Sequence, residues 1–312
     1  MRRAILLTSL IVVGGLSMAV AALQQPAKPL NVRDIQKVRE NLYFVSGGDT
    51  YDRSTWTGGN TIVFVTDKGV VLVDTMLAGA GRGILERVKS VTDKPVTTII
   101  NTHTHYDHSG SNTEFPATIE YVAHENTRAN MAKPSCPPVT NCDAFKGENA
   151  RYLPKRTYKD RLTLFSGRDQ IDLYHFGRGH TNGDTFVVFP AARVMHTGDM
   201  YPRAHMPFID VADNAGSAVE FNQTLQRAVS GITNVETVIG GHTPSPVTWA
   251  DFVTYVDFYR DFLTSAQEAL KKGTAVEAFV KAYRVPEKYK GFQADPQRVE
   301  ANAKAIWSES KK

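Results

Sequence analysis

The sequence has no run of lysine and arginine, no internal repeat, and only two cysteines among its 312 residues. Charged residues make up 22% of the chain and the formal net charge is +4. A nucleic-acid footprint needs a concentrated basic patch, so we do not expect a nucleic acid as a partner. The absence of a repeat argues against a solenoid. With 42% hydrophobic residues, the chain can bury a full core as one large domain or two smaller ones.

The two cysteines lie close together, in the stretch CPPVTNC. Cys136 and Cys142 enclose five residues, and in an oxidising compartment we expect them to close a small disulfide loop. Two free thiols are the alternative, and they are less favourable outside the cytoplasm. A metal-binding role for the pair is weak, because the chain offers a better group of ligands elsewhere.

The N-terminus, MRRAILLTSLIVVGGLSMAVAALQQPAKP, has the pattern of a secretory signal. Arg2 and Arg3 precede an apolar stretch that runs from Ala4 to Leu23, and Ala19 to Ala21 offer small residues for cleavage. A membrane anchor is the alternative, because the stretch is nearly long enough to span a bilayer. The small residues favour cleavage. A lipid anchor is not expected, because the region around the cleavage site contains no cysteine. We therefore predict a signal peptide over residues 1–24, no stable membrane anchor, and a periplasmic or secreted protein.

The rest of the chain, residues 25–312, is predicted to be one catalytic domain whose C-terminal segment, from about residue 249, is helical. The stretches NLYFVSGG and NTIVFVTDKGVVLVDT read as strands divided by turns, and AGRGILERVKSVT has helical spacing of its apolar residues. After a Pro-rich loop at residues 133–155, strands resume with RTYKDRLTLFSG, DQIDLYHFG and DTFVVFPAARVMHTGD. A β-rich segment followed by a βα segment thus occurs twice. This order predicts two similar halves, each with a sheet inside and helices outside.

The stretch PVTTIINTHTHYDH runs from a β-branched strand into a cluster of ionisable residues. His103 and His105 are two positions apart, so they face the same side if the strand continues. Asp107 and His108 follow where the chain must turn. Loops at the carboxyl ends of strands are where α/β sheets place their ligands. Imidazole nitrogens and carboxylate oxygens are ligands that zinc accepts.

Three further ligand-type residues follow predicted strands downstream. They are His180 in GRGHTNGD, Asp199 in VMHTGDM and His242 in VIGGHTP, and each has a neighbouring glycine that lets the backbone turn or approach closely. A purely structural role does not explain the whole set. We predict a metal site made by His103, His105, Asp107, His108, His180, Asp199 and His242. Zinc is the default ion for such nitrogen and oxygen ligands, and iron or manganese also fits.

The order H-x-H-x-D-H, then G-H, G-D and G-H, resembles the metallo-β-lactamase superfamily, and the resemblance extends from about Asn41 to Thr243. It implies a four-layered αββα sandwich with the site at one edge of the two sheets. It also implies two metals per chain. One would be held by His103, His105 and His180, the second by Asp107, His108 and His242, with Asp199 and a hydroxide bridging the two.

A binuclear site of this kind lowers the pKa of a shared water, so that hydroxide is available to attack a carbonyl-type carbon. Asp107 is the predicted catalytic residue, because it can orient the nucleophile or accept its proton. We therefore predict an exported hydrolase acting on a small amide or ester, such as a β-lactam or a lactone. A thioester hydrolase and an iron-dependent redox enzyme of the same fold remain alternatives, since the fold does not decide among them.

Two loops are predicted to contact the small-molecule substrate. The glycine-bracketed stretch SGGDTYDRSTWTGGN suits a mobile flap with Tyr51 and Trp56 as contacts, although an ordinary hairpin loop fits as well. In MYPRAHMPFID, Arg203 is placed either to hold a substrate carboxylate or to be solvated. The remaining histidines are expected to have structural roles, with His124 in capping or packing. Contact with the ligands is the alternative for His175 and His196, which lie in predicted strands beside them, and contact with substrate is the alternative for His205.

Overall fold

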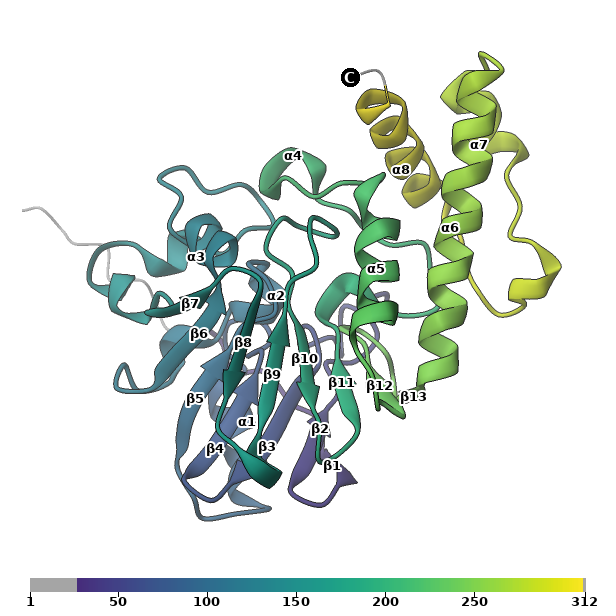
Figure 1. The fold of residues 1–312 in the computed structure, drawn as a ribbon. Helices are drawn as coiled ribbons and strands as arrows, with labels where there is room; N and C mark the ends of the chain where they lie inside the picture. Colours follow the sequence, from purple (N-terminus) through teal and green to yellow (C-terminus); the bar gives the residue numbers. More distant parts are fainter. Residues whose placement is uncertain (1–26, 311–312) are drawn as a thin grey trace, which may run out of the picture.

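The computed structural model describes residues 27–310, and it arranges them as two packed β-sheets with helices on the outer faces (Figure 1). The signal peptide expected at residues 1–24 lies outside the described residues. Within residues 27–310, no helix combines the length and the apolar character needed to cross a membrane.

The first sheet has seven strands in sequence order. Its first four strands form an antiparallel meander, and the later strands add in parallel. The strands are β1 (Ile35–Arg39), β2 (Leu42–Val45), β3 (Thr61–Thr66), β4 (Gly69–Val73), β5 (Val96–Ile100), β6 (Glu120–His124) and β7 (Arg156–Tyr158).

The second sheet has six strands in the order β13-β12-β11-β10-β9-β8. It also begins as an antiparallel meander, and β11 then pairs in parallel with β12. The strands are β8 (Arg161–Leu164), β9 (Ile171–Tyr174), β10 (Phe186–Phe189), β11 (Val194–His196), β12 (Thr237–Ile239) and β13 (Val247–Thr248).

Eight α-helices connect and cover these sheets in the described part of the chain. They are α1 (Gly81–Lys89), α2 (Tyr106–Ser109), α3 (Glu125–Met131), α4 (Val211–Asn214), α5 (Glu220–Gly231), α6 (Trp249–Lys271), α7 (Val276–Ala282) and α8 (Pro296–Glu309). Short 3-10 turns are η1 (Asn112–Glu114), η2 (Asp143–Phe145), η3 (Gly147–Tyr152), η4 (Gly167–Asp169), η5 (Gly198–Met200) and η6 (Glu287–Tyr289).

Three apolar clusters define the layers. The central cluster joins side chains of both sheets, for example Phe64 of β3 and Phe189 of β10, whose ring centroids are 5.0 Å apart. A second cluster packs the other face of the first sheet against α1, and a third packs the other face of the second sheet against α5, α6, α7 and α8. Strand residues alternate between these clusters because successive side chains point to opposite faces. The predicted αββα sandwich is confirmed.

One predicted strand is divided between the two sheets. The stretch RTYKDRLTLFSG forms β7, which pairs with β6, and β8, which pairs with β9. Lys159 and Asp160 make the connection between them. The sequence has no strong turn signal at this point. The division was not predicted, since the packing of the two sheets rather than a local motif determines where the chain crosses.

The Pro-rich segment at residues 133–155 contacts the chain just after β5, at residues 104–106. Cys136 and Cys142 form a disulfide, as the sequence predicts. Between them, the carbonyl oxygen of Val139 accepts a hydrogen bond of 3.1 Å from the backbone N–H of Tyr106, and Thr140 forms an isolated β-bridge with His105. The disulfide loop is therefore held against the middle of the HTHYDH segment, at residues 104–106.

Candidate metal centre

The structure brings together all seven residues predicted as metal ligands. His103, His105, Asp107 and His108 follow the carboxyl end of β5, and His180 lies in the loop after β9. Asp199 lies in η5 after β11, and His242 follows β12. These strand ends meet at one edge of the two sheets, so residues far apart in sequence converge there. The five histidines are buried and the two aspartates nearly so.

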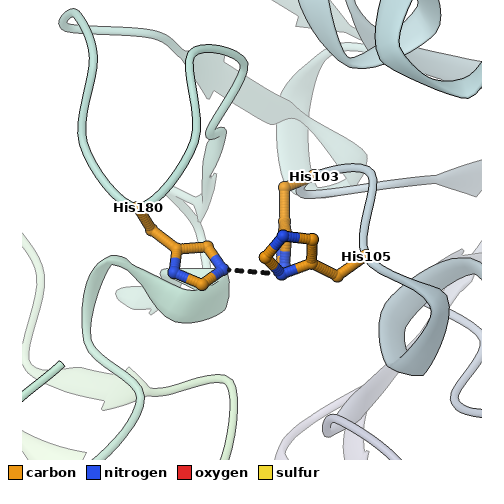
Figure 2. Close-up of side chains that lie close together, drawn as sticks. All are labelled: His103, His105 and His180. Carbon is orange, nitrogen blue, oxygen red and sulfur yellow. Dashed lines mark hydrogen bonds between the residues drawn. The ribbon is translucent and has the colours of Figure 1, made fainter. Parts of the chain in front are cut away.

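Three imidazoles form the first group. The candidate ligand atoms of His103, His105 and His180 all lie within 4.8 Å of one another, and His105 Nδ1 is 2.9 Å from His180 Nε2 (Figure 2). Burial holds the pKa of His103 well below its ordinary value, and the neighbouring imidazoles lower it further. Burial likewise lowers the pKa of His180. Neutral imidazole is the form that binds a metal ion.

In each of these imidazoles, one ring nitrogen lies within hydrogen-bond distance of another group of the protein, which fixes the orientation of the ring. His103 Nδ1 lies 3.0 Å from Thr102 Oγ1, His105 Nε2 lies 2.9 Å from Asp210 Oδ2, and His180 Nδ1 donates to the carbonyl oxygen of Phe208 at 2.7 Å. The opposite nitrogens face the common centre. His103 Nε2 is buried and has no hydrogen-bond partner among residues 27–310. Such outer partners are typical of metal-binding histidines, because they fix the tautomer and the ring orientation.

Removal of the Asp210 carboxylate, which contacts His105, is expected to weaken metal binding although Asp210 is not itself a candidate ligand. Asp210→Ala leaves His105 Nε2 without its partner, so we expect metal affinity to fall about 10–100-fold. Asp210→Asn keeps an acceptor oxygen and is expected to lose less. Metal affinity is measured by competition with a chromophoric chelator, and circular dichroism checks folding. Wild-type affinity in folded Asp210→Ala would contradict the orienting role.

Asp107, His108 and His242 form the second group. His242 Nε2 lies 3.4 Å from Asp107 Oδ2 and 3.4 Å from His108 Nε2, and His108 Nε2 lies 3.7 Å from Asp107 Oδ2. Burial lowers the pKa of His242, but the carboxylates of Asp199 and Asp107 outweigh it and raise the pKa to about 9. Burial raises the pKa of Asp107, but the charge of His108 and the contact with His242 lower it to about 2. The group is thus built to hold positive charge.

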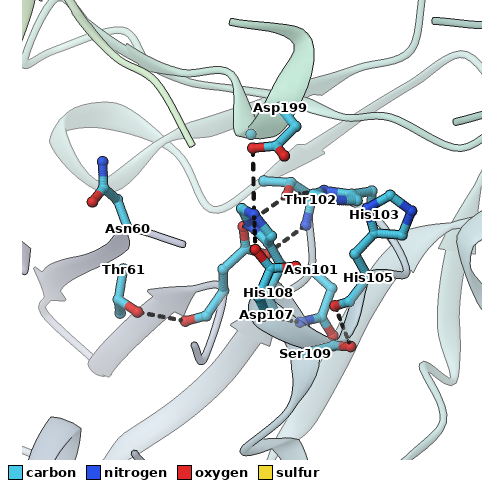
Figure 3. A network of polar contacts seen from close by, with 12 residues as sticks. Asn60, Thr61, Asn101, Thr102, His103, His105, Asp107, His108, Ser109 and Asp199 are labelled. Carbon is cyan, nitrogen blue, oxygen red and sulfur yellow. Dashed lines mark hydrogen bonds and ion pairs between the residues drawn. The ribbon is translucent and has the colours of Figure 1, made fainter. Parts of the chain in front are cut away.

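Asp199 lies between the two groups. Its Oδ1 is 3.3 Å from His108 Nε2 (Figure 3). The same oxygen is 3.3 Å from His242 Nε2, whereas Oδ2 is 3.6 Å from His180 Nε2. Although burial raises the pKa of Asp199, the charges of His242 and His108 hold it well below its ordinary value. One carboxylate oxygen therefore faces each group, which is the arrangement that a bridging ligand requires.

Two glycines permit this close approach. A Cβ at Gly241 would lie 1.9 Å from Asp199 Oδ1, and a Cβ at Gly59 would lie 2.2 Å from Cε1 of His108. Gly241 is the neighbour that the sequence marked as allowing close backbone approach beside His242. Gly59 belongs to the predicted flap, so one end of that loop packs directly on a candidate ligand.

Asp74 is a buried residue of the site that the sequence analysis missed. It directly follows β4 with a φ of 61°, a backbone conformation that only a few non-glycine residues adopt. Its carboxylate accepts from the backbone N–H of Thr102 at 2.8 Å and from Thr102 Oγ1 at 2.7 Å, and it lies 2.7 Å from His108 Nδ1. Asp74 therefore orients His108 as Asp210 orients His105. Its position after the strand VVLV was the signal that could have found it.

A cavity of about 380 Å³ opens over the two groups, a size within the usual range for small-molecule sites. Asp107, Asp199 and three of the histidines form its floor. Its walls include the predicted substrate contacts Tyr51, Trp56 and Arg203, together with Val139 of the disulfide loop, Phe208 and Arg298.

The predicted substrate contacts differ in their surroundings. The Tyr51 side chain is 63% exposed, and Arg203 Cζ lies 4.5 Å from its ring centroid. Arg203 also forms an ion pair of 3.1 Å with Asp49, so its charge has a partner within the protein. Trp56 is half-buried, and its ring centroid is 6.4 Å from that of His242. All three line the cavity, but Arg203 is less available to an anion than the sequence suggested.

The other histidines occupy four different positions. His124 accepts a hydrogen bond from the backbone N–H of Asn126 and caps α3, as predicted. His175 stacks on His124 with centroids 3.9 Å apart, away from the candidate ligands. His196 Nε2 lies 3.7 Å from Asp74 Oδ2, and His205 lines the cavity.

Comparison with known proteins agrees with this geometry. A model of the metallo-beta-lactamase superfamily matches residues 54–259. The chain is 23% identical over 244 residues to a metallo-beta-lactamase type 2 of Elizabethkingia meningoseptica, which covers 76% of this chain and 87% of that protein. It is 30% identical over 143 residues to the alpha subunit of 2,4-dinitroanisole O-demethylase of Nocardioides sp. (strain JS1661), which covers 45% of this chain and 40% of that protein.

Two solved structures share the fold. A metallo-beta-lactamase from Pontibacter korlensis superposes with a TM-score of 0.59 at 19% identity, over 73% of this chain and 99% of that chain. An inverting sec-alkylsulfatase from Pseudomonas sp. superposes with a TM-score of 0.66 at 16% identity, over 88% of this chain and 50% of that chain. At these identities the likeness concerns the fold alone.

Proposed function

The chain belongs to the metallo-beta-lactamase superfamily, and from this premise we propose that it is a hydrolase with two zinc ions that cleaves a small amide or ester. The observation that carries the proposal is the position of Asp199, with one carboxylate oxygen toward each group of candidate ligands. A single cation does not need a carboxylate placed in this way, whereas a pair does.

The proposed ligand roles follow from which atoms face one another. His103, His105 and His180 would hold one ion, and Asp107, His108 and His242 the other. Asp199 would bridge the two ions. Histidine nitrogens with carboxylate oxygens and no thiolate are a donor set that zinc accepts. Two observations support occupation of both positions. His103 Nε2 is buried without a hydrogen-bond partner among residues 27–310, and the carboxylates of Asp199 and Asp107 lie beside His242, where they favour a positive charge.

When bound, two such ions supply Lewis acidity toward the substrate carbonyl group and lower the pKa of water. The other steps belong to this chain's own residues. Asp107 reaches the cavity floor beside His242, where its carboxylate orients a water and accepts its proton. The same proton then passes to the leaving nitrogen or oxygen. Tyr51 and Trp56 on the cavity wall orient the organic part of the substrate.

An elemental analysis together with a substrate panel tests this proposal. We expect zinc near two ions per chain, and turnover of a member of the amide and ester classes in a panel of β-lactams, lactones, thioesters, phosphodiesters and sec-alkyl sulfates. The sulfates are included because the fold is shared with a sec-alkylsulfatase. If thioesters alone are turned over, the proposed amide or ester substrate is wrong and the protein is a thioester hydrolase. Iron with consumption of dioxygen would overturn the hydrolase proposal in favour of redox chemistry.

We also propose that the protein is exported. The support is the signal pattern of residues 1–24 and the disulfide between Cys136 and Cys142, since disulfides persist in oxidising compartments. The intact mass of protein from the periplasmic fraction is expected to show the loss of about two dozen residues, the usual length of a signal peptide. Full-length protein retained in the membrane fraction would instead indicate an anchored enzyme.

A further inference from the structure

The C-terminal segment, residues 260–310, lies beyond residues 54–259 that match the family, and it contributes Arg298 to the lining of the cavity. Gln293 exchanges backbone hydrogen bonds with Ala204 and Met206, at 3.0 and 2.8 Å. Asn302 of α8 is buried and donates to the carbonyl oxygen of Pro207 at 3.0 Å. The segment thereby fixes the stretch that leads to Phe208, whose carbonyl oxygen orients His180.

Arg298 of α8 reaches the cavity over this stretch. Its Cζ lies 4.7 Å from the ring centroid of Phe208, and the same ring packs against His105 and His180 at centroid distances of 6.0 and 5.8 Å. One aromatic ring thus separates the guanidinium from two candidate ligands. Arg298 is also among the residues that line the cavity.

The Arg298 guanidinium has no directly paired carboxylate within residues 27–310, although the charges of Asp199 and Asp295 act to raise its pKa. Across residues 27–310 it forms neither an ion pair nor a side-chain hydrogen bond, and its contact is the ring of Phe208. Burial lowers its pKa, because desolvation disfavours the charged form. A half-buried cation without a partner is costly. An anion that enters the cavity would remove this cost.

The other two arginines that line the cavity differ from Arg298 in charge pairing or in burial. Arg203 is paired with Asp49 at 3.1 Å. Arg53 is exposed to solvent and lies over Trp56, with its Cζ 4.4 Å from the ring centroid. Arg298 alone among the three combines partial burial with an unpaired charge.

We propose that Arg298 is a specificity-determining residue that binds a carboxylate of the substrate, at a distance from the bond that is cleaved. A guanidinium matches a carboxylate through two parallel hydrogen bonds. The substrate class is therefore an amide or ester that carries a second, anionic group. This inference rests on the proposed function, because it assumes that the scissile group lies over the candidate metal centre.

The test uses two hydroxamates that differ only in charge and needs no turnover. Succinic monohydroxamate carries a hydroxamate, which binds metal ions, and a free carboxylate. Its amide, succinamide monohydroxamate, has the same shape and no charge. Isothermal titration of the zinc-loaded protein is expected to show at least about tenfold tighter binding of the carboxylate, the value of a hydrogen-bonded charge pair. Arg298→Gln should remove that preference and leave the affinity for the amide unchanged.

Three further variants separate the possible outcomes. Lys304→Gln removes an exposed cation of the same helix and should keep the preference, whereas Arg298→Lys should keep part of it. If Arg203→Gln rather than Arg298→Gln removes the preference, the carboxylate binds Arg203 and the proposal is wrong. Equal binding of both hydroxamates by the wild-type protein would also overturn it. Failure of both probes to bind would instead count against the metal centre and hence against the proposed function.

Discussion

Asp199→Ala is expected to lower the metal content of the purified protein from about two ions per chain to one or fewer and to abolish measurable turnover. The carboxylate faces both groups of candidate ligands, so its removal would leave each of the two proposed ions one ligand short and would remove the anion between them. Loss of an outer partner of a metal ligand alone costs about 10–100-fold in affinity or activity. Loss of a ligand shared by two ions should cost more.

The metal content of Asp199→Ala is measured by elemental analysis after dialysis against a weak chelator. Asp199→Asn serves as a matched variant, because it keeps the shape of the side chain and removes the charge. Asp172→Asn serves as a remote control, because Asp172 is a buried aspartate of β9 whose partners include Arg161 and Thr163. Two tightly bound ions and normal turnover in Asp199→Ala would show that the carboxylate does not bridge.

The second large effect is expected for Asp107→Asn, with a fall in kcat/KM on the order of 10²-fold or more, the usual range for loss of a general base. The amide retains the shape of the side chain, but it carries no charge and accepts a proton poorly. The low pKa of Asp107, about 2, arises from the neighbouring His108 and His242 despite burial. The carboxylate is therefore ionised near neutral pH, and with so low a pKa it can hold a proton only transiently before passing it to the leaving group.

Part of the loss in Asp107→Asn would come from weaker binding at the second group, so the metal content is determined on the same sample used for kinetics. Activity is compared at metal concentrations that restore full occupancy. A variant that binds two ions and keeps kcat/KM within a few-fold of the wild type would exclude Asp107 as the proton acceptor and leave it only as a ligand.

The sequence was most informative where local patterns coincide with tertiary positions. The seven predicted ligands all follow strands, and the carboxyl ends of strands in a two-sheet sandwich meet at one edge, so the strand pattern and the ligand pattern support each other. Asp74 lies in the same context, after VVLV, and was missed because a single aspartate after a strand is common. Asp210 was missed because its contact with His105 spans 105 positions of sequence.

Arg298 could not be predicted from the sequence. An arginine near the start of an amphipathic helix is usually solvated, and nothing local indicates that α8 packs over Phe208. That placement depends on contacts such as Asn302 with Pro207, between segments 95 positions apart. Arg203, which follows a ligand motif, was the more obvious candidate, and only the structure reveals its pairing with Asp49.

The origin of the oxygen in the product tests the central claim of hydrolysis most directly. The substrate is the amide or ester of the panel that the protein converts. The reaction is run under argon in water enriched in heavy oxygen, and the mass of the product is determined by mass spectrometry. Hydrolysis predicts a single heavy oxygen in each newly formed acid group and a rate that does not depend on dissolved dioxygen. Turnover that stops under argon, or a product whose new oxygen is unlabelled, would contradict the assignment of this site as a hydrolase centre.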